Sequence, residues 1–233
     1  MQTWRMSRGQ LEERLQEITK SLSTPSENNL DLYDLKVILE NQIAVLDKRA
    51  VKLWEESEVG KKYEPCTFES FDEKGFERQL QIAKDFVKEF RHDSGQGLIF
   101  HGSYGTGKTH LAVAIARELL RQKGCSVWFK TFGELLQEIR NGFKSGTAEA
   151  ISKRYYTVDV LVMDDLGKEK LSEWTSEQLF NIVNERYKAQ KSMIITTNLN
   201  IAELNRRLDG AVMSRLVETC KAVEMTGKDY RLK

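Results

Sequence analysis

The sequence predicts an α/β protein in which a parallel β-sheet lies between layers of helices. From about residue 97 onward, short apolar segments typical of buried strands alternate with longer segments of helical periodicity. The first apolar segment runs directly into residues 102–109, which have the spacing G-x-x-x-x-G-K-T, and a helical pattern follows at once. The chain has 233 residues, which is enough for one domain of this kind and a smaller appendage.

The N-terminal part is predicted to be a separate helical module. Two helices, joined by a polar loop at residues 23–29, each carry apolar residues on one face that neither helix can bury alone. These residues are Leu11, Leu15, Ile18 and Leu22 in the first helix and Leu32, Leu35, Leu39, Ile43, Leu46, Leu53 and Trp54 in the second. We therefore expect a helical module at residues 1–60, which either packs against the rest of the chain or binds a partner protein. A linker at residues 61–67 should follow.

The main domain is expected to cover residues 68–233. Its strands should be parallel, because a helix separates each strand from the next, so their carboxyl ends should meet at one edge of the sheet. The expected helices lie at about 77–90, 108–122, 132–139 and 176–188, and the expected strands at 97–101, 126–130, 158–163, 192–197 and 222–225.

Composition excludes several classes of protein. Lysine and arginine almost balance aspartate and glutamate, with a net charge of +1, so a nucleic-acid-binding surface would have to be local. Cys66, Cys125 and Cys220 are scattered, which argues against a disulfide framework or a zinc site, and the three histidines lack metal-ligand spacing. Without a signal peptide or a long apolar run, we expect a soluble, cytoplasmic chain with no membrane association.

The motif at residues 102–109 is typical of a loop that binds nucleotide phosphates. Its glycines let backbone N–H groups turn toward a phosphate at the N-terminus of a helix. Lys108 is expected to reach the β- and γ-phosphates, and the Thr109 hydroxyl to bind Mg²⁺. The expected nucleotide-binding residues are Gly102, Ser103, Tyr104, Gly105, Thr106, Gly107, Lys108, Thr109 and His110.

Two further strands end in polar residues at the same predicted edge. Asp164 and Asp165 follow an apolar strand, and we expect Asp164 to hold the Mg²⁺ shell and Asp165 to polarise the attacking water. Asn198 follows the next strand, where it either orients water near the γ-phosphate or caps the following helix. The sequence therefore predicts a site that hydrolyses a nucleoside triphosphate.

The ordered motifs GSYGTGKT, VLVMDDLG, IITTN, VMSRL and GKDYR resemble the AAA+ ATPases of the DnaC/DnaI helicase-loader type and their IstB-type transposition relatives, from Phe68 to the C-terminus. The resemblance implies ATP as the nucleotide, a reduced or absent helical lid, and assembly into a homo-oligomer. It also implies that Arg215 reaches the ATP of a neighbouring subunit as a catalytic residue and that Arg231 senses the γ-phosphate of its own subunit. One departure is Asp165, where many AAA+ proteins have glutamate. The shorter acid suggests slow hydrolysis, suited to a switch.

The resemblance also implies single-stranded DNA binding on an extra helical element at about residues 132–156. Cations beside exposed aromatic rings are suited to binding a strand without regard to its sequence. The candidate DNA-binding residues are Lys130, Phe143, Lys144 and Lys153. The same residues also suit an amphipathic helix whose aromatic side chains belong to the core.

These observations favour an ATPase that loads a replicative ring helicase onto single-stranded DNA, with the N-terminal helices binding the helicase and ATP hydrolysis releasing the loader. The first alternative is an IstB-type transposition helper that acts on duplex DNA with a transposase. A small-molecule kinase is disfavoured, because the two acids and the polar end of the next strand are the hydrolase arrangement. A nucleotide-gated scaffold that scarcely hydrolyses ATP stays open because of Asp165.

Overall fold

The sheet at the centre of the molecule has five parallel strands. The computed structural model describes residues 8–23, 29–169 and 172–230. The strand order is β2-β3-β4-β1-β5, and the strands are β1 (Gly97–His101), β2 (Val127–Thr131), β3 (Val160–Asp164), β4 (Ser192–Thr197) and β5 (Cys220–Glu224). The predicted α/β fold class is thereby confirmed.

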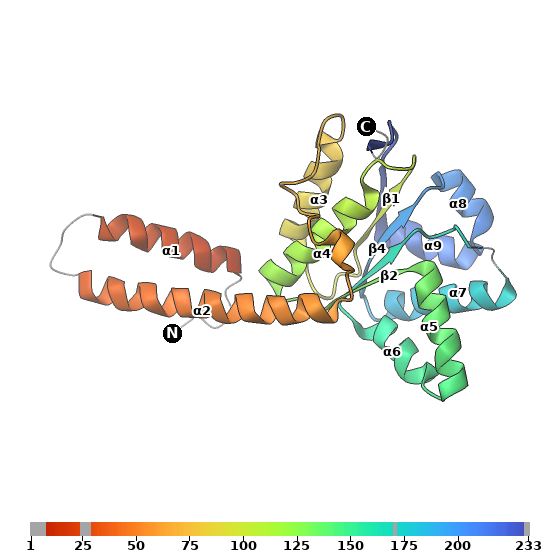
Figure 1. The fold of residues 1–233 in the computed structure, drawn as a ribbon, viewed down its shortest axis with the longest axis horizontal. Coiled ribbons are helices and arrows are strands. Elements are labelled where there is room, and N and C mark those ends of the chain that lie inside the picture. The colour runs from red at the N-terminus through yellow and green to blue at the C-terminus, as the bar shows by residue number, and fades with distance from the viewer. Residues whose placement is uncertain (1–7, 24–28, 170–171, 231–233) are drawn as a thin grey trace.

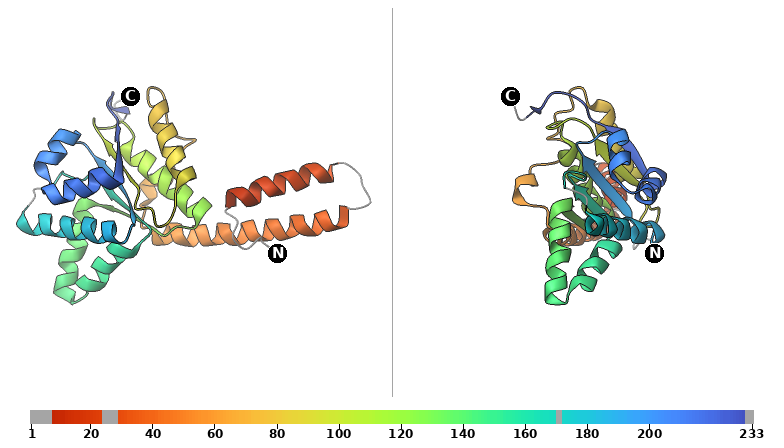
Figure 2. Two further views of the ribbon diagram at one scale, coloured as in Figure 1. Left: turned by 180° about the vertical axis from the view of Figure 1, so that it is seen from behind. Right: turned by 90° about the vertical axis from the view of Figure 1, so that its right-hand side faces the viewer.

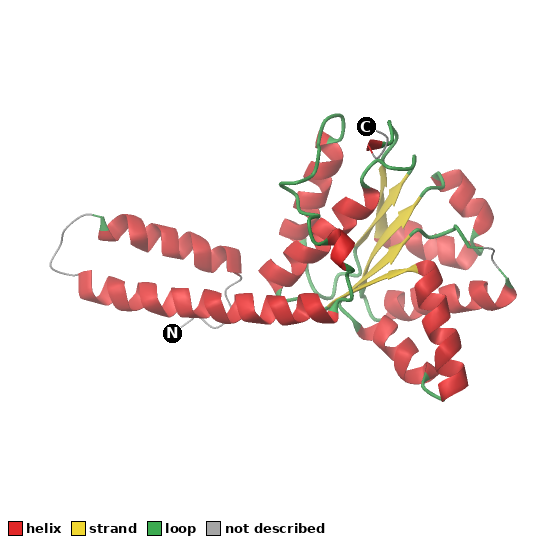
Figure 3. Cartoon of the chain, viewed as in Figure 1, coloured by secondary structure: helices red, strands yellow, loops and turns green. Residues whose placement is uncertain are grey.

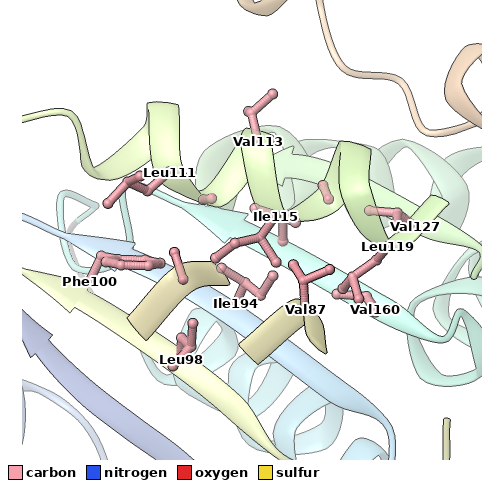
Figure 4. Close-up of a cluster of buried hydrophobic side chains, with 14 of the residues drawn as sticks. Val87, Leu98, Phe100, Leu111, Val113, Ile115, Leu119, Val127, Val160 and Ile194 are labelled. Atoms are coloured by element: carbon pink, nitrogen blue, oxygen red, sulfur yellow. The ribbon is translucent and has the colours of Figure 1, made fainter. Parts of the chain in front are cut away.

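Helices cover both faces of this sheet, as its apolar strands require (Figure 1 and Figure 2). One face packs against α3 (Glu77–Glu89) and α4 (Lys108–Lys123), and Figure 4 shows Leu98 and Phe100 of β1 in that layer. Ile99, between them, points into the opposite layer. That layer is formed by α5 (Phe132–Ser145), α6 (Ala148–Thr157), α7 (Glu173–Lys188), α8 (Ile201–Arg207) and α9 (Gly210–Thr219).

The N-terminal helices form a hairpin that projects from the sheet domain (Figure 1 and Figure 3). Helix α1 (Arg8–Leu22) packs along α2 (Asn29–Glu56) around a small core of Leu11, Ile18 and Leu39. Helix α2 is 28 residues long, and its C-terminal end reaches the sheet domain. Within the described ranges, no helix combines the length and apolar character that crossing a membrane needs.

Several elements begin or end at other residues than predicted, and side-chain hydrogen bonds accompany two of these differences. Helix α7 begins at Glu173, because Ser172 and Thr175 form a capping box there. Strand β3 begins at Val160 rather than at residue 158, because the Asp159 carboxylate accepts hydrogen bonds from the amide and hydroxyl of Ser126. Helix α5 continues beyond Ile139 to Ser145, and α6 follows it as a separate helix.

Candidate nucleotide site

The loop between β1 and α4 has the geometry that its glycines make possible. Gly107 is the residue before α4, with φ of 90°, and a β-carbon there would lie 2.6 Å from the Phe71 ring. Only glycine fits both this conformation and this close contact. The Lys108 ammonium donates to the carbonyl oxygens of Gly102 (3.0 Å) and Ser103 (2.5 Å), so it lies within the curve of the loop.

The loop forms one side of a cavity of about 630 Å³. Its lining brings together most of the residues that the sequence singled out, from Tyr104 through His110 and on to Asp164, Asp165 and Asn198. Gly102 and Ser103 lie beside it through their bonds to Lys108. The remaining lining residues are Lys62, Tyr63, Cys66, Ser70, Phe71, Asp72, Lys168 and Tyr230.

Asp164 lies at the end of β3 and is only 4% exposed. Its Oδ1 accepts hydrogen bonds from the hydroxyls of Thr109 (2.8 Å) and Thr196 (2.6 Å). Burial raises the pKa of this carboxyl, the two hydroxyl donors act in the opposite direction, and the neighbouring Asp165 raises it further. A hydroxyl and a carboxylate in contact are the hard oxygen ligands that Mg²⁺ prefers, so Thr109 and Asp164 fit the ion together with nucleotide phosphates.

Asp165 follows in a left-handed conformation, with φ of 59°. Aspartate tolerates this region better than most residues. Its amide donates to the Thr196 hydroxyl (3.0 Å), and its Oδ1 accepts from the side-chain amide of Asn198 (2.9 Å). Asn198 therefore holds the carboxylate in the cavity, and the cap of α8 is Asn200 instead.

Residues 57–72, which we call the strap, contribute several side chains to the same cavity, and sequence reasoning missed this role. Tyr63 contacts the Phe129 ring of β2, and burial raises the pKa of its phenol, with Asp164 and Asp165 adding to the effect. Burial likewise raises the pKa of the Cys66 thiol. The aromatic residues Phe68 and Phe71 were the available signal, but their spacing is equally typical of a domain boundary.

Of the two arginines predicted to contact ATP, Arg215 and Arg231, the structure describes only Arg215. Arg231 lies outside the described residues. Arg215, on α9, does not line the cavity of its own chain; its guanidinium lies over the rings of Phe180 and Tyr187 and donates to the Ala211 carbonyl (2.9 Å). This position is compatible with a role toward another subunit and excludes a contact with the cavity in cis.

The candidate DNA-binding residues separate into two groups. Phe143, on α5, is 62% exposed, and Lys144 and Lys153 are exposed as well. Lys130 is different: its side chain is 15% exposed, and its ammonium pairs with Glu58 (2.6 Å) and Glu138 (3.2 Å). In this structure Lys130 joins the strap to the sheet domain, and its charge is neutralised by these carboxylates.

Comparisons with known proteins agree with this geometry. The family described as IstB-like ATP binding protein matches residues 10–233. The chain is 31% identical over 177 residues to the replicative helicase loader DnaC of Escherichia coli strain K12, covering 73% of this chain and 71% of that protein. It is 30% identical over 200 residues to the phage-like element PBSX protein XkdC of Bacillus subtilis, covering 80% and 74%.

A third relative is the putative ATP-binding protein of insertion sequence IS232 from Bacillus thuringiensis, with 28% identity over 171 residues and coverage of 70% and 68%. Among solved structures, that of the DnaC helicase loader superposes with a TM-score of 0.68 at 33% identity, covering 71% of this chain and 99% of that one. The replication initiator DnaA, bound to AMPPCP and single-stranded DNA, superposes with a TM-score of 0.63 at 25% identity, covering 73% and 52%.

Proposed function

The chain belongs to the IstB-like ATP-binding family, among AAA+ ATPases of the DnaC type, and from that premise we propose that it uses ATP to load a replicative ring helicase onto single-stranded DNA. The observation that carries the ATPase part is the joined arrangement of Thr109, Asp164, Asp165 and Asn198 at the sheet edge. Mg²⁺ supplies charge neutralisation for the phosphates when bound. Asp165, held by Asn198, orients the attacking water.

The hairpin supports the loader part of the proposal. Helix α2 carries apolar side chains on the face that does not pack against α1, and Leu30 is 79% exposed. An apolar row opposite a packed face is typical of a helix that docks on another protein. The exposed residues of this outer stripe are Leu30, Tyr33, Val37, Ile38, Val45 and Val51. We propose that the outer stripe binds the helicase.

The helicase test uses the full chain and one added charge. Val37→Asp places a carboxylate in the outer stripe, while Thr19→Asp places the same group on exposed α1. With the ring helicase of the same genome and a forked DNA coated with single-strand-binding protein, wild type and Thr19→Asp should stimulate unwinding and Val37→Asp should not. Equal stimulation by both variants would refute the docking surface. No stimulation by wild type would refute the loader role.

The second candidate function is that of an ATPase that assists a transposase, and the similarity to the putative ATP-binding protein of insertion sequence IS232 favours it. It predicts assembly on duplex DNA and binding to a transposase. Fluorescence anisotropy with labelled oligo-dT and a matched duplex under ATP separates the two, since the loader should prefer the single strand. Charge reversal of Lys144 and Lys153 should weaken binding and flatten its salt dependence, whereas Phe143→Ala should weaken binding with little change in slope.

We propose that Arg215 contributes to ATP hydrolysis at a site that two neighbouring subunits share. Arg215→Ala should keep ATP binding and lose hydrolysis in the assembly, because a positive charge no longer reaches the neighbouring phosphates. Mixing this variant with Lys108→Ala should restore some activity, since each defect can lie at a different interface. A site shared between subunits would be refuted by two results together: no mixing ratio of the two variants restores hydrolysis, and the wild-type monomer hydrolyses ATP at the full rate.

A further inference from the structure

Two residues of α4, His110 and Arg117, contact the strap through side-chain hydrogen bonds. His110 and Arg117 have the i, i+7 spacing that places side chains on one face of a helix. The His110 Nε2 lies 2.7 Å from the Thr67 carbonyl oxygen and 3.4 Å from the Ser70 hydroxyl. A guanidinium nitrogen of Arg117 donates to the Glu64 carbonyl oxygen at 2.5 Å. Both contacts join residues that are far apart in the sequence.

The strap is held at both of its ends. Its beginning lies against β2 and α2, and its end lies against the nucleotide site. At its beginning, the Phe129 amide of β2 donates to the Ser57 carbonyl (2.9 Å), and the Arg117 guanidinium lies 4.3 Å from the centre of the Trp54 ring on α2. At its end, Phe71 packs edge-on against the His110 ring (5.3 Å between ring centres) and closely against Gly107. The strap therefore connects the end of the hairpin with the phosphate loop.

Ser70 closes a compact turn within the strap, and this turn forms part of the cavity wall. Its hydroxyl donates to the Pro65 carbonyl (2.6 Å) and accepts from the Thr67 amide (3.0 Å). The side chains that this turn contributes to the cavity are Cys66, Ser70, Phe71 and Asp72. They are mostly neutral or apolar, so their chemistry suits the base and ribose of a nucleotide better than its phosphates.

We propose that His110 and Arg117 are positioning residues that hold the strap against α4 and so set the affinity for the base-and-ribose half of the nucleotide. This rests on the proposed ATP binding and assigns to the two side chains a role separate from that of the phosphate loop. His110 thus acts through the strap rather than on a phosphate. The phosphate half of the site has contacts of its own, from Lys108 to the carbonyls of Gly102 and Ser103 and from Thr109 to Asp164, and it should keep them when the strap is loosened.

Calorimetric titration with two probes separates these halves. Mg-ATP occupies the whole cavity, whereas inorganic tripolyphosphate needs only the loop and Lys108. Arg117→Met and His110→Leu should each weaken Mg-ATP binding roughly tenfold and change tripolyphosphate binding less than about twofold. Arg121→Met is the matched control, because Arg121 lies on the same helix and its guanidinium pairs with Glu118 and Glu12, and it should change neither affinity.

Ser70→Ala provides an independent variant, since it loosens the turn without altering α4, and it should show the same loss confined to ATP. The double variant of His110 and Arg117 should lose less than the sum of the single effects, because both act on one segment. Equal losses for both probes, or no loss for ATP, would overturn the inference. Wild-type protein that binds no ATP would instead overturn the proposed function, so the two failures are distinguishable.

Discussion

The nucleotide edge of the sheet and the outer face of the hairpin differ in how their side chains are held. At the sheet edge, Asp164 is buried and accepts two hydroxyl hydrogen bonds, and Asp165 is held by Asn198 and Thr196. On the hairpin, the outer stripe of α2 has apolar side chains such as Leu30 in solvent. The first region is organised by contacts within one chain, whereas the apolar side chains of the second stay exposed in the described part of the chain.

The energetic reason lies in what surrounds each region. The sheet edge rests on two large apolar clusters that cover both faces of the strands, so polar side chains there are fixed by rigid elements. The hairpin is stabilised by a small core centred on Leu11, Ile18 and Leu39. A small core leaves helices easier to reorient, which suits partner binding and does not suit catalysis.

Loss of the phosphate-binding charge should be the most severe change. Lys108→Ala should weaken ATP binding by about 100-fold or more, because the ammonium is a charge-assisted donor to phosphate oxygens. The fold should remain, since Lys108 belongs to neither apolar cluster. Calorimetry and a thermal melt check both statements, and Lys123→Ala at the other end of α4 is the control. Unchanged ATP affinity would show that the site is misassigned.

Replacing Asp164 should improve stability while removing activity. Burial raises the pKa of this carboxyl, so its contribution to stability is present below the unfolded-state pKa and is lost as pH rises through the folded-state value. At neutral pH the buried charge is therefore unfavourable, and Asp164→Asn should stabilise the ligand-free protein by roughly 1 kcal/mol. Mg²⁺-dependent hydrolysis should fall about 100-fold or more.

Thermal melts at neutral and acidic pH measure this effect, and the stability gap between variant and wild type should shrink on acidification. Asp165→Asn is the comparison variant. It should keep ATP bound and lose turnover, because the role proposed for Asp165 is to orient the attacking water rather than to bind the nucleotide. If Asp165→Asn lost ATP binding while Asp164→Asn kept turnover, the two roles would be reversed.

Two substitutions on α2 should separate the inner and outer faces of the hairpin. Leu39→Ala removes a fully buried side chain and should destabilise the hairpin by about 2–3 kcal/mol, whereas Val37→Asp lies on the exposed outer stripe and should cost little stability. Hydrogen exchange of the α1 and α2 amides checks this difference. ATP affinity should be close to wild type in both. A large loss of ATP affinity in Leu39→Ala would show that the hairpin core also supports the nucleotide site.

The smallest effect concerns thiol chemistry at the cavity. Burial raises the pKa of Cys125 to about 12 and that of Cys220 to about 11, so few thiolates form there at pH 8. Cys66 is only half-buried and lines the cavity, and it should be alkylated first. Mass spectrometry after maleimide treatment should show a severalfold slower reaction of Cys66 with ATP present. Equal rates with and without ATP would argue that the strap lies away from the bound nucleotide.

Local sequence determined the fold class and the phosphate half of the site. The motif at residues 102–109 lies between a strand and a helix, and the acids at 164 and 165 end the next-but-one strand, so parallel order alone brings them to one edge. Tyr155 illustrates the limit of this reasoning. Although it lies within residues 132–156, the element expected to bind DNA, it is fully buried and stacked on Trp128, with 4.4 Å between ring centres.

Only the tertiary structure decided the contacts that cross between elements. Lys130 is neutralised by Glu58 and Glu138, Arg215 lies over two rings of α7, and the strap meets α4 through His110 and Arg117. The physical reason is that periodicity reports which face of an element is apolar, and a motif reports chemistry within a few residues. Which distant side chain neutralises a charge, or which loop closes a cavity, depends on packing between segments that the sequence pattern leaves unspecified.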